Sequence, residues 1–379
     1  MVFKKIVSLS IALSVILSNS LIPIYAMDNI KSPEINVLED YTDLYNLKKK
    51  KSKEAKNLKT TGKINNIAVF IEFEDQKSIT INDSDTRAKA EEVFNTGGTN
   101  DSSYGKIPLV SLNQYLKSMS YNKLDVKTSI YPNEKNNGTT VIPYVSSKPR
   151  TYFMKKSNLA PDGYTNIIEQ NKRESELLEG ALNHVKSQIE KDFTGDQLDT
   201  NNDGYIDAIS FFTEGNYGPY YGIGFQDLLW PHKADGYFQT KIAGKDVFNY
   251  NLITTGDPNY PGGIFSKTRT AYGVIVHEFL HVLGLPDLYR NSQIGNPVGQ
   301  WSMMASNGSQ ALNPITAFYQ NEYLNWGSKL QVIGPGTHKV TLSKPKYDNP
   351  NEKKAVIIKS PLNKNESFVV EFRKKEGFM

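Results

Sequence analysis

Two of the five histidines in this 379-residue sequence stand four residues apart, in the segment HEFLHVLGLPD that runs from His277 to Asp287. Residues four apart on a helix lie one turn above each other, so a helix would direct the imidazoles of His277 and His281 at one position. Glu278 is rotated from His277 by about 100°, which sets its carboxylate beside that position. The spacing predicts a divalent metal held by both histidines, with Glu278 placed to take a proton from water.

A catalytic zinc ion needs a third protein ligand and keeps one position for water. We expect the helix to run from about Thr268 to Leu283 and to end at Gly284, which can adopt the left-handed backbone of a helix cap. Beyond that bend, Asp287 is close enough in sequence to bring a carboxylate oxygen to the same ion. Glu322, in FYQNEYLNW, is the alternative third ligand.

A second segment, DTNNDGYID, spaces oxygen donors as a calcium loop of the EF-hand type does. The donors at positions one, three, five, seven and nine are Asp199, Asn201, Asp203, the carbonyl of Tyr205, and Asp207. Gly204 stands at position six, where such a loop bends sharply. Position twelve is Ser210 instead of glutamate, so we expect Ca²⁺ with water or a distant residue completing its ligands. The alternative is an acidic turn without a metal.

The other histidines carry weaker signals. His232, in LLWPHK with Trp230 and Pro231, could help line a substrate cleft, although packing of the tryptophan under a loop explains the segment equally well. His184 borders the apolar face of an expected helix, and His338 lies in the turn-like segment GPGTHKV. We expect both of these to be solvated side chains and not ligands.

The elements that must position these groups are mixed along the chain. Apolar periodicity predicts strands at residues 65–75, 123–132 and from 208 onward, and helices at 111–120, with Ser111 as its N-cap, and at 175–193. Helices and strands follow one another without regular alternation and without an internal repeat. This order favours an α+β, or mixed α/β, fold over a doubly wound sheet.

Composition narrows the class of protein. Apolar residues make up 38% and charged residues 22%, which is typical of a globular chain. The net charge of +4 is small and lies largely in one lysine run, so we expect no nucleic-acid partner. Cysteine is absent, which excludes thiol nucleophiles, thiolate ligands and disulfides. Any metal site must therefore use imidazole, carboxylate or carbonyl groups.

The N-terminal residues predict export. Lys4 and Lys5 precede the apolar run Ile6 to Leu17, and Ala26 follows a stretch of small and polar residues, which is the order of a secretory signal peptide. An uncleaved anchor helix is the alternative, although the run is shorter than the roughly 20 residues that a bilayer needs. We therefore assign residues 1–26 to the signal, 27–63 to a pro-segment or lysine-rich linker, and 64–379 to a catalytic domain. We expect a secreted, extracellular monomer without stable membrane association.

The sequence resembles the immune inhibitor A family of secreted bacterial metalloproteases. The similarity covers about residues 64–379 and is carried by HEFLHVLGLPDLY, WSMMASNGS, IAVFIEFED, SLNQYLKSMSYNKLDV, DTNNDGYID and LLWPHK. It implies a metzincin-like zinc endopeptidase with a twisted mixed sheet, an active-site helix that carries the histidines, and a smaller C-terminal subdomain. Family members usually continue beyond SFVVEFRKKEGFM, so we expect the chain to be truncated at its C-terminus.

The resemblance also assigns individual roles. It implies His277, His281 and Asp287 as zinc ligands and Glu278 as the base. The longer metzincin motif has histidine as its third ligand, so Asp287 departs from that motif and adds negative charge to the site. Metzincins also carry a methionine beneath the metal, and in GNPVGQWSMMASNGS we choose Met304, with its neighbour Met303 as the next to test.

These observations predict a secreted, zinc-dependent endopeptidase that acts on extracellular proteins and peptides. Zinc would lower the pKa of its water to about 7, and Glu278 would accept the proton of the water and return it to the leaving amine. One alternative is a non-catalytic, calcium-stabilised binding protein with a vestigial metal site. Another is an exopeptidase.

Overall fold

The computed structural model describes residues 58–75, 86–102, 105–133, 135–136, 140–213, 229, 231–236, 238–254, 269–289, 298–305, 312–344 and 348–373. The predicted signal peptide and most of the predicted pro-segment or linker lie outside the described residues, as does Trp230.

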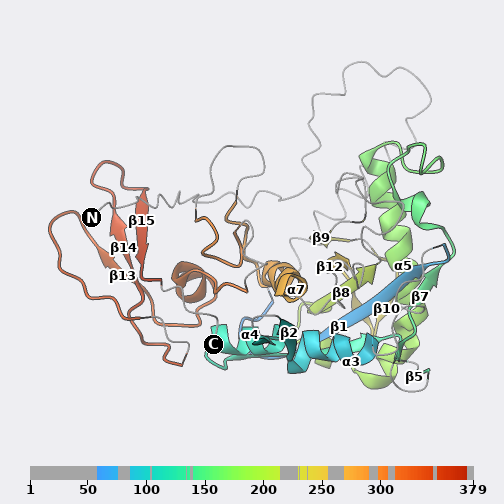
Figure 1. Cartoon of the computed structure of the whole chain (residues 1–379), viewed down its shortest axis with the longest axis horizontal. Coiled ribbons are helices and arrows are strands. Elements are labelled where there is room, and N and C mark those ends of the chain that lie inside the picture. The colour runs from blue at the N-terminus through green and yellow to red at the C-terminus, as the bar shows by residue number, and fades with distance from the viewer. Residues whose placement is uncertain are drawn as a thin grey trace, which may run out of the picture.

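The chain folds into a main sheet flanked by helices and a separate small sheet formed by its C-terminal strands (Figure 1). Its elements are β1 (Gly62–Phe73), α3 (Thr86–Glu91), the π-helical turn η2 (Glu92–Thr96), β2 (Gly98–Ser102), β3 (Gly105–Leu109), α4 (Leu112–Met119), β4 (Leu124–Tyr131), β5 (Lys135–Asn136), β6 (Thr140–Val141), β7 (Tyr144–Ser146), the 3₁₀ turn η3 (Arg150–Phe153), α5 (Ile167–Asp192), α6 (Gly195–Leu198), β8 (Ala208–Thr213), β9 (His232–Asp235), β10 (Lys241–Ile242), β11 (Lys245–Asp246), β12 (Asn249–Thr254), α7 (Arg269–Val282), the π-helical turn η7 (Tyr319–Tyr323), β13 (Gln331–Ile333), β14 (Ala355–Lys359) and β15 (Ser367–Glu371).

The main sheet contains strands of both directions. Its order is β4–β1–β8–β12–β9, and β7 pairs with the C-terminal residues of β1. The pairs β1–β4, β1–β7, β1–β8 and β8–β12 are parallel, whereas β9 runs antiparallel to β12 at the end of the order. A mixed sheet with several helices confirms the predicted mixed α/β class.

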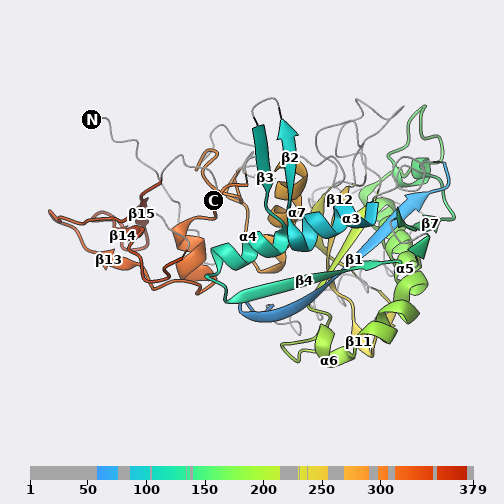
Figure 2. The same cartoon turned by 60° about the horizontal axis from the view of Figure 1, so that its bottom comes forward.

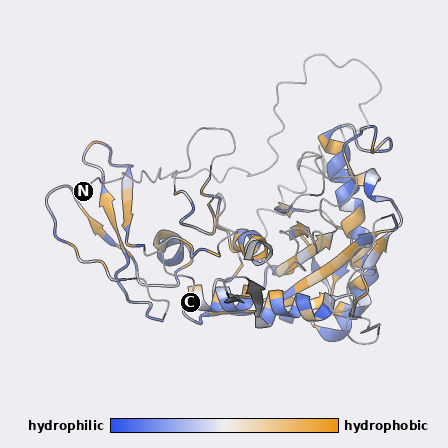
Figure 3. Cartoon of the chain, in the orientation of Figure 1, coloured by the Kyte–Doolittle hydropathy of each residue, from blue (hydrophilic) through white to orange (hydrophobic). Residues whose placement is uncertain are grey.

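Both faces of the main sheet are covered, because β1 sends alternate side chains into two cores. Ile67 and Val69 pack in one core with the apolar face of α5. Ala68 and Phe70 pack in the other with α4 and α7. Figures 1 and 2 show α5 on one side of the sheet and α4 with α7 on the other. Hydrophobic colour accordingly concentrates on the strands of the main sheet in Figure 3.

The predicted helices form where expected, with one difference in length. The side chain of Ser111 accepts the backbone N–H of Gln114 in a capping box, which confirms the predicted N-cap of α4. Helix α5 starts at Ile167, two turns before the predicted start, and Asn166 caps it. Ile167 and Ile168 are followed by the polar run of residues 169–176, so the apolar period begins only later. Within that run, Arg173 pairs with Glu169 one turn away.

The C-terminal strands form a three-stranded sheet in the order β13–β14–β15. Figure 1 places this sheet on the far side of α7 from the main sheet. Lys354, just before β14, is buried and hydrogen-bonds to the hydroxyl of Tyr121 and, at 3.2 Å, to Oε1 of Gln320. Burial lowers the pKa of Lys354 to about 8. A polar contact therefore joins the strand to the end of α4.

The packed structure begins a few residues before the predicted boundary at residue 64. Leu58 is buried, and Thr60 exchanges hydrogen bonds with the carbonyl of Leu324 and the indole N–H of Trp326. In the described part of the chain, no helix combines the length and the apolar character needed to cross a bilayer.

Candidate metal centre

Helix α7 carries the histidine pair and ends in a glycine cap. Gly284 has φ of 90°, its N–H donates to the carbonyl of His281 at 2.9 Å, and the N–H of Leu285 donates to the carbonyl of Leu280 at 3.1 Å. These are the two hydrogen bonds of a Schellman motif. The predicted cap at Gly284 is confirmed, and α7 itself ends at Val282. The opposite face of α7 lies in the core through Val276 and Phe279, among others.

Backbone carbonyls fix the orientation of both imidazoles. Nδ1 of His277 lies 2.8 Å from the carbonyl of Met303, and Nδ1 of His281 lies 2.7 Å from the carbonyl of Leu285. A carbonyl only accepts, so each Nδ1 must carry the proton. In a neutral ring Nε2 then presents a lone pair. Carbonyl contacts of this kind are what orients metal-binding histidines in general.

Asp287 brings a carboxylate oxygen to both lone pairs. Its Oδ1 lies 3.1 Å from Nε2 of His277 and 3.3 Å from Nε2 of His281. Loop residue Leu288 is held by a 2.6 Å hydrogen bond from its N–H to the carbonyl of Met304. Among the described residues, His277, His281 and Asp287 form a cluster of three possible metal ligands, whose ligand atoms all lie within 4.8 Å of one another.

These donor atoms fit a metal ion. Oδ1 of Asp287 is buried and accepts no hydrogen bond, although two ring nitrogens face it. Three lone-pair atoms at such short range repel one another unless a cation lies between them. Metal bonds of about 2.0–2.1 Å in a tetrahedron place ligand atoms about 3.3 Å apart, close to the separations of 3.1 and 3.3 Å. Two nitrogens and one carboxylate oxygen suit zinc.

Glu322, the alternative third ligand, is engaged elsewhere. It lies in η7, its Oε1 accepts the N–H of Leu330 at 2.6 Å, and its Oε2 lies 3.4 Å from Nζ of Lys329. The structure therefore brings Asp287, and not Glu322, to the imidazoles.

Burial and charge shift the titration of this group in opposite directions. Burial acts to raise the pKa of Asp287, but contact with His277 and His281 outweighs it and holds that pKa below its usual range. Burial acts to lower the pKa of His277, but Asp287 and the charge of Glu278 leave it raised. Glu278 is only 8% exposed, and burial raises its pKa against the charges of the nearby histidines. A buried carboxyl with a raised pKa is suited to proton transfer.

A polar network that the sequence does not indicate lies beside the helix. Nε2 of His232, on β9, lies 3.2 Å from Oε1 of Glu174 on α5, and the hydroxyl of Tyr250 donates to the same oxygen. The charge of His232 is one of those that lower the pKa of Glu278, so the network lies within electrostatic range of that carboxyl. Glu174 is separated from its partners by 58 and 76 residues, so no local pattern could have revealed it.

Tyr289 was also missed, although it stands two residues after Asp287. Its ring lies 6.4 Å from that of His277, with 21° between the planes. Burial raises the pKa of Tyr289, as do the charge of Asp287 and a hydrogen bond to it. The signal available was its position in the HEFLHVLGLPDLY segment.

The other predicted residues take the following places. Met303 and Met304 are both fully buried in the core that contains α7, and their carbonyls hold His277 and Leu288. His184 and His338 are exposed. His184 lies with its ring 5.4 Å from that of Tyr144.

The predicted calcium loop lies between α6 and β8. Asp199 and Asp207 are buried, and Gly204 has φ of 90° at the sharp bend. Nζ of Lys245 lies 2.8 Å from Oδ2 of Asp199. A lysine in contact with this loop was not expected from the sequence.

In this mixed α/β domain, one helix and its capped end gather two imidazoles and a carboxylate with a buried glutamate beside them, an arrangement typical of metallopeptidases. This chain belongs to the immune inhibitor A family: the family model "immune inhibitor A peptidase M6, catalytic domain" matches residues 50–325. The match contains the whole main sheet and α7.

The solved structures that resemble the chain are distant. Two crystal structures of wild type OgpA from Akkermansia muciniphila match at 13% and 14% identity, with TM-scores of 0.32 and 0.34. The first match covers 70% of this chain and 61% of OgpA, and the second covers 85% and 83%. In the first match, the chain thus spans about three fifths of the OgpA chain. A comparison with curated proteins gives no match.

Proposed function

We propose that the protein is a secreted, zinc-dependent endopeptidase with His277, His281 and Asp287 as zinc ligands and Glu278 as the general base. One observation carries the proposal: Oδ1 of Asp287 is buried, accepts no hydrogen bond and faces Nε2 of both His277 and His281. Because backbone carbonyls hold the Nδ1 atoms of both rings, the lone pairs of the Nε2 atoms point toward this oxygen. Membership in a metallopeptidase family supports the same assignment.

Bound zinc would supply Lewis acidity, polarising the scissile carbonyl and lowering the pKa of a coordinated water. Glu278 follows His277 on the same helix and is buried, so its carboxylate lies next to the ligand group in an environment that excludes bulk water. It removes the proton of the attacking water and later delivers it to the leaving amine. Burial raises the pKa of Glu278, which makes its carboxylate a stronger base for the first of these two steps.

We place the substrate along β9. Among the strands that the structure describes, β9 ends the order of the main sheet, and an extended peptide can add to such an edge through backbone hydrogen bonds. His232, at the start of β9, is held by Glu174 and lies within electrostatic range of Glu278. An extended binding mode suits cleavage within a chain, which favours an endopeptidase over an exopeptidase.

The remaining parts of the proposal follow the sequence prediction. The motif and the buried turn of Met303 and Met304 support a metzincin-like fold with Met304 beneath the metal. The β13–β15 sheet supports a smaller C-terminal subdomain. We retain residues 1–26 as signal peptide, 27–63 as pro-segment or linker, of which residues 58–63 pack against the domain, and 64–379 as the catalytic domain of a secreted monomer. We also retain Ca²⁺ as the ion bound by the loop of residues 199–207.

The proposal is tested by comparing Glu278→Gln with the unchanged enzyme. We expect the variant to bind one zinc ion as before and to lose at least about a thousandfold in the rate of casein cleavage. Metal analysis and a chelator-sensitive protease assay on the same preparation measure both quantities. A peptide blocked at both ends, analysed by product sequencing, distinguishes internal cleavage from removal of terminal residues.

Retention of casein cleavage by Glu278→Gln would show that Glu278 is not the general base. Absence of zinc and of cleavage in the unchanged protein would favour the alternative of a non-catalytic binding protein.

A further inference from the structure

A buried carboxylate beside the main sheet joins side chains from three distant parts of the chain. Glu174, on α5, is only 8% exposed. Its Oε1 accepts the hydroxyl of Tyr250 on β12 and lies 3.2 Å from Nε2 of His232 on β9. A carboxylate oxygen only accepts hydrogen bonds, so Nε2 of His232 must carry a proton. Glu174 therefore fixes the orientation of this ring and one of its protons.

Tyr250 holds the same ring by packing. The centroid of its ring lies 5.9 Å from that of His232, with 71° between the planes, which is an edge-to-face contact. Burial raises the pKa of Tyr250 well above its usual value, as do the charge of Glu174 and the hydrogen bond to it. Tyr250 therefore remains a hydrogen-bond donor to Glu174 at neutral pH, and the ring of His232 has two fixed neighbours.

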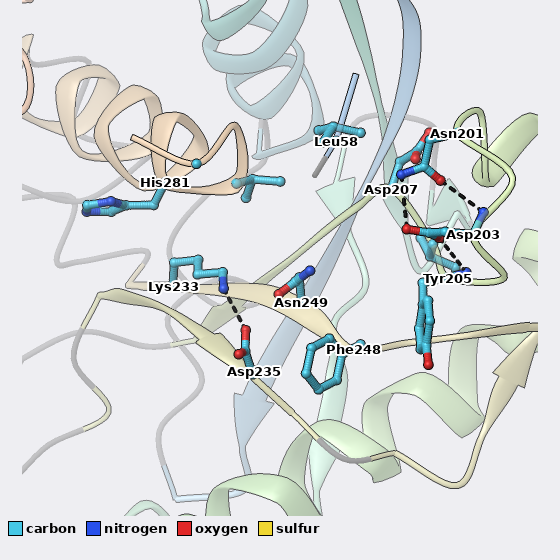
Figure 4. A pocket seen from close by; sticks show the side chains of 13 residues that line it. Leu58, Asn201, Asp203, Tyr205, Asp207, Lys233, Asp235, Phe248, Asn249 and His281 are labelled. Carbon is cyan, nitrogen blue, oxygen red and sulfur yellow. Dashed lines mark hydrogen bonds and ion pairs between the residues drawn. The ribbon is translucent and has the colours of Figure 1, made fainter. Parts of the chain in front are cut away.

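Strand β9 carries this ring between α5 and α7. Successive side chains of a strand point to opposite faces. Lys233 and Asp235 form a 2.6 Å ion pair and line one cavity together with His281 of α7 (Figure 4). His232 faces α5 instead, and Ala234 packs against the core that contains α5. The strand thus holds His232 close to the turn of α7 that carries a proposed zinc ligand.

His232 brings a positive charge to this edge of the sheet. Burial raises the pKa of Glu278, and the charges of His277, His281 and then His232 act against it, so His232 lies within electrostatic range of that carboxyl. The side chain of His232 is 27% exposed, whereas that of Glu174 is 10% exposed. The ring is therefore held from its buried side and remains accessible to a peptide that adds to β9.

The following inference rests on the proposed peptidase function and on a substrate that lies along β9. We propose that the imidazolium of His232, held by Glu174 and Tyr250, stabilises the negative charge that develops on the scissile carbonyl oxygen. A charge that is fixed before the reaction is effective because nothing has to reorganise when the transition state forms. Since the ground-state carbonyl is neutral, the interaction should raise kcat more than it lowers KM. His232 is then a catalytic residue, and Glu174 is its positioning residue.

His232→Gln and Glu174→Gln test the proposal in the full, processed chain. Glutamine keeps an N–H donor for Glu174 but removes the positive charge. On a casein peptide we expect kcat of His232→Gln to fall about a hundredfold and KM to stay within about threefold, with zinc stoichiometry and Tm unchanged. In Glu174→Gln the ring is held less firmly, so kcat should fall about tenfold. His184→Gln is the matched control, because His184 is exposed on the same helix as Glu174, and it should keep the unchanged rate.

Peptide binding gives a readout besides turnover. A phosphinic analogue of the casein peptide carries a tetrahedral, negatively charged group in place of the scissile amide and so resembles the transition state. Its inhibition constant should rise in His232→Gln by the factor by which kcat/KM falls. The parent peptide, titrated by calorimetry into Glu278→Gln with and without His232→Gln, should bind with equal affinity in both.

Unchanged kcat in His232→Gln, or equal weakening of the phosphinic and parent peptides, would overturn the proposal and leave the ring as a structural link between β9 and α5. If His232→Gln does not fold, Glu174→Gln decides by the same two measurements. Absence of zinc and of cleavage in the unchanged enzyme would overturn the peptidase function and this inference together. Normal cleavage by the unchanged enzyme, with an equal rate in His232→Gln, would overturn the inference alone.

Discussion

The cluster of His277, His281 and Asp287 and the loop of residues 199–207 both gather charged side chains, but they do so by different means. In the cluster, a buried helix sets the spacing of His277 and His281, and backbone carbonyls turn their lone pairs inward. In the loop, backbone N–H groups hold the carboxylates, and Lys245 occupies one of them. The first arrangement presents nitrogen ligands on a rigid element, and the second presents oxygens on a turn. This difference predicts different ions and different affinities.

The largest expected effect comes from removing the carboxylate of the cluster. Asp287→Asn removes the negative charge that faces two ring nitrogens, so we expect zinc affinity to fall by at least about a hundredfold, with cleavage lost in parallel. Competition with a chromophoric chelator measures the affinity. Glu322→Gln is the control and should keep its zinc, because Glu322 binds Leu330 and Lys329. Loss of zinc from Glu322→Gln alone would show that Glu322, and not Asp287, is the third zinc ligand.

The pH dependence of stability should separate metal-free from zinc-bound protein. His277 has a raised pKa, so without metal its pairing with Asp287 stabilises the fold fully below 6.5 and is lost as pH rises through the raised value. The pKa of Asp287 is lowered, so its contribution is present above 3.8 and is lost as pH falls through the lowered value. Zinc must displace the proton of His277, so zinc stabilisation grows in the opposite direction, with rising pH.

Thermal unfolding from about pH 5 to pH 8, with and without zinc, measures this effect. We expect the increase in Tm on adding zinc to be larger at the alkaline end and to have its midpoint above 6.5. An increase that is independent of pH would contradict proton displacement from His277. The calcium-induced increase should instead fall toward acid as Asp207 takes up a proton, with a midpoint above 3.8.

A moderate effect is expected for Tyr289. Tyr289→Phe keeps the ring beside His277 but removes the hydroxyl that contacts Asp287. We expect kcat/KM to fall about tenfold, with zinc stoichiometry unchanged and no change in calcium affinity. Tyr323→Phe is the control, because Tyr323 is half exposed, and it should stay near the unchanged rate. Equal rates in both variants would show that the Tyr289 hydroxyl has no role in cleavage.

The smallest effects come from a matched pair of glycines, one in each region. Gly284 and Gly204 both have φ of 90°, and a Cβ at either would meet nothing within 4 Å. Alanine at each position therefore costs only the left-handed backbone, about 1–2 kcal/mol, measured by denaturant unfolding. We expect Gly284→Ala to loosen zinc and Gly204→Ala to loosen calcium. A loss of both ions in either variant would show that the two regions are coupled more strongly than their separate elements suggest.

Local patterns predicted much of the scaffold. The strands at β1, β4 and β8, the N-cap of α4 at Ser111 and the cap of α7 at Gly284 all depend on neighbours in sequence, and all are present. Strands β9 and β12 were not predicted, because short strands in segments rich in Gly, Pro and Tyr have no clear apolar period. The early start of α5 was missed for the same reason, since residues 169–176 form a polar run between its first two isoleucines and its apolar face.

The sequence by itself determined which atoms could bind metals, because spacing on one helix and along one loop is a local property. Helical spacing therefore predicted how His277, His281 and Glu278 lie relative to one another before any fold was known. Only the tertiary structure decided which carboxylate joins them, which carbonyls orient the rings, and that Lys245 reaches Asp199 from 46 residues away. Those contacts depend on how distant segments pack, and burial, which sets the charge state of each group, is a property of the whole fold.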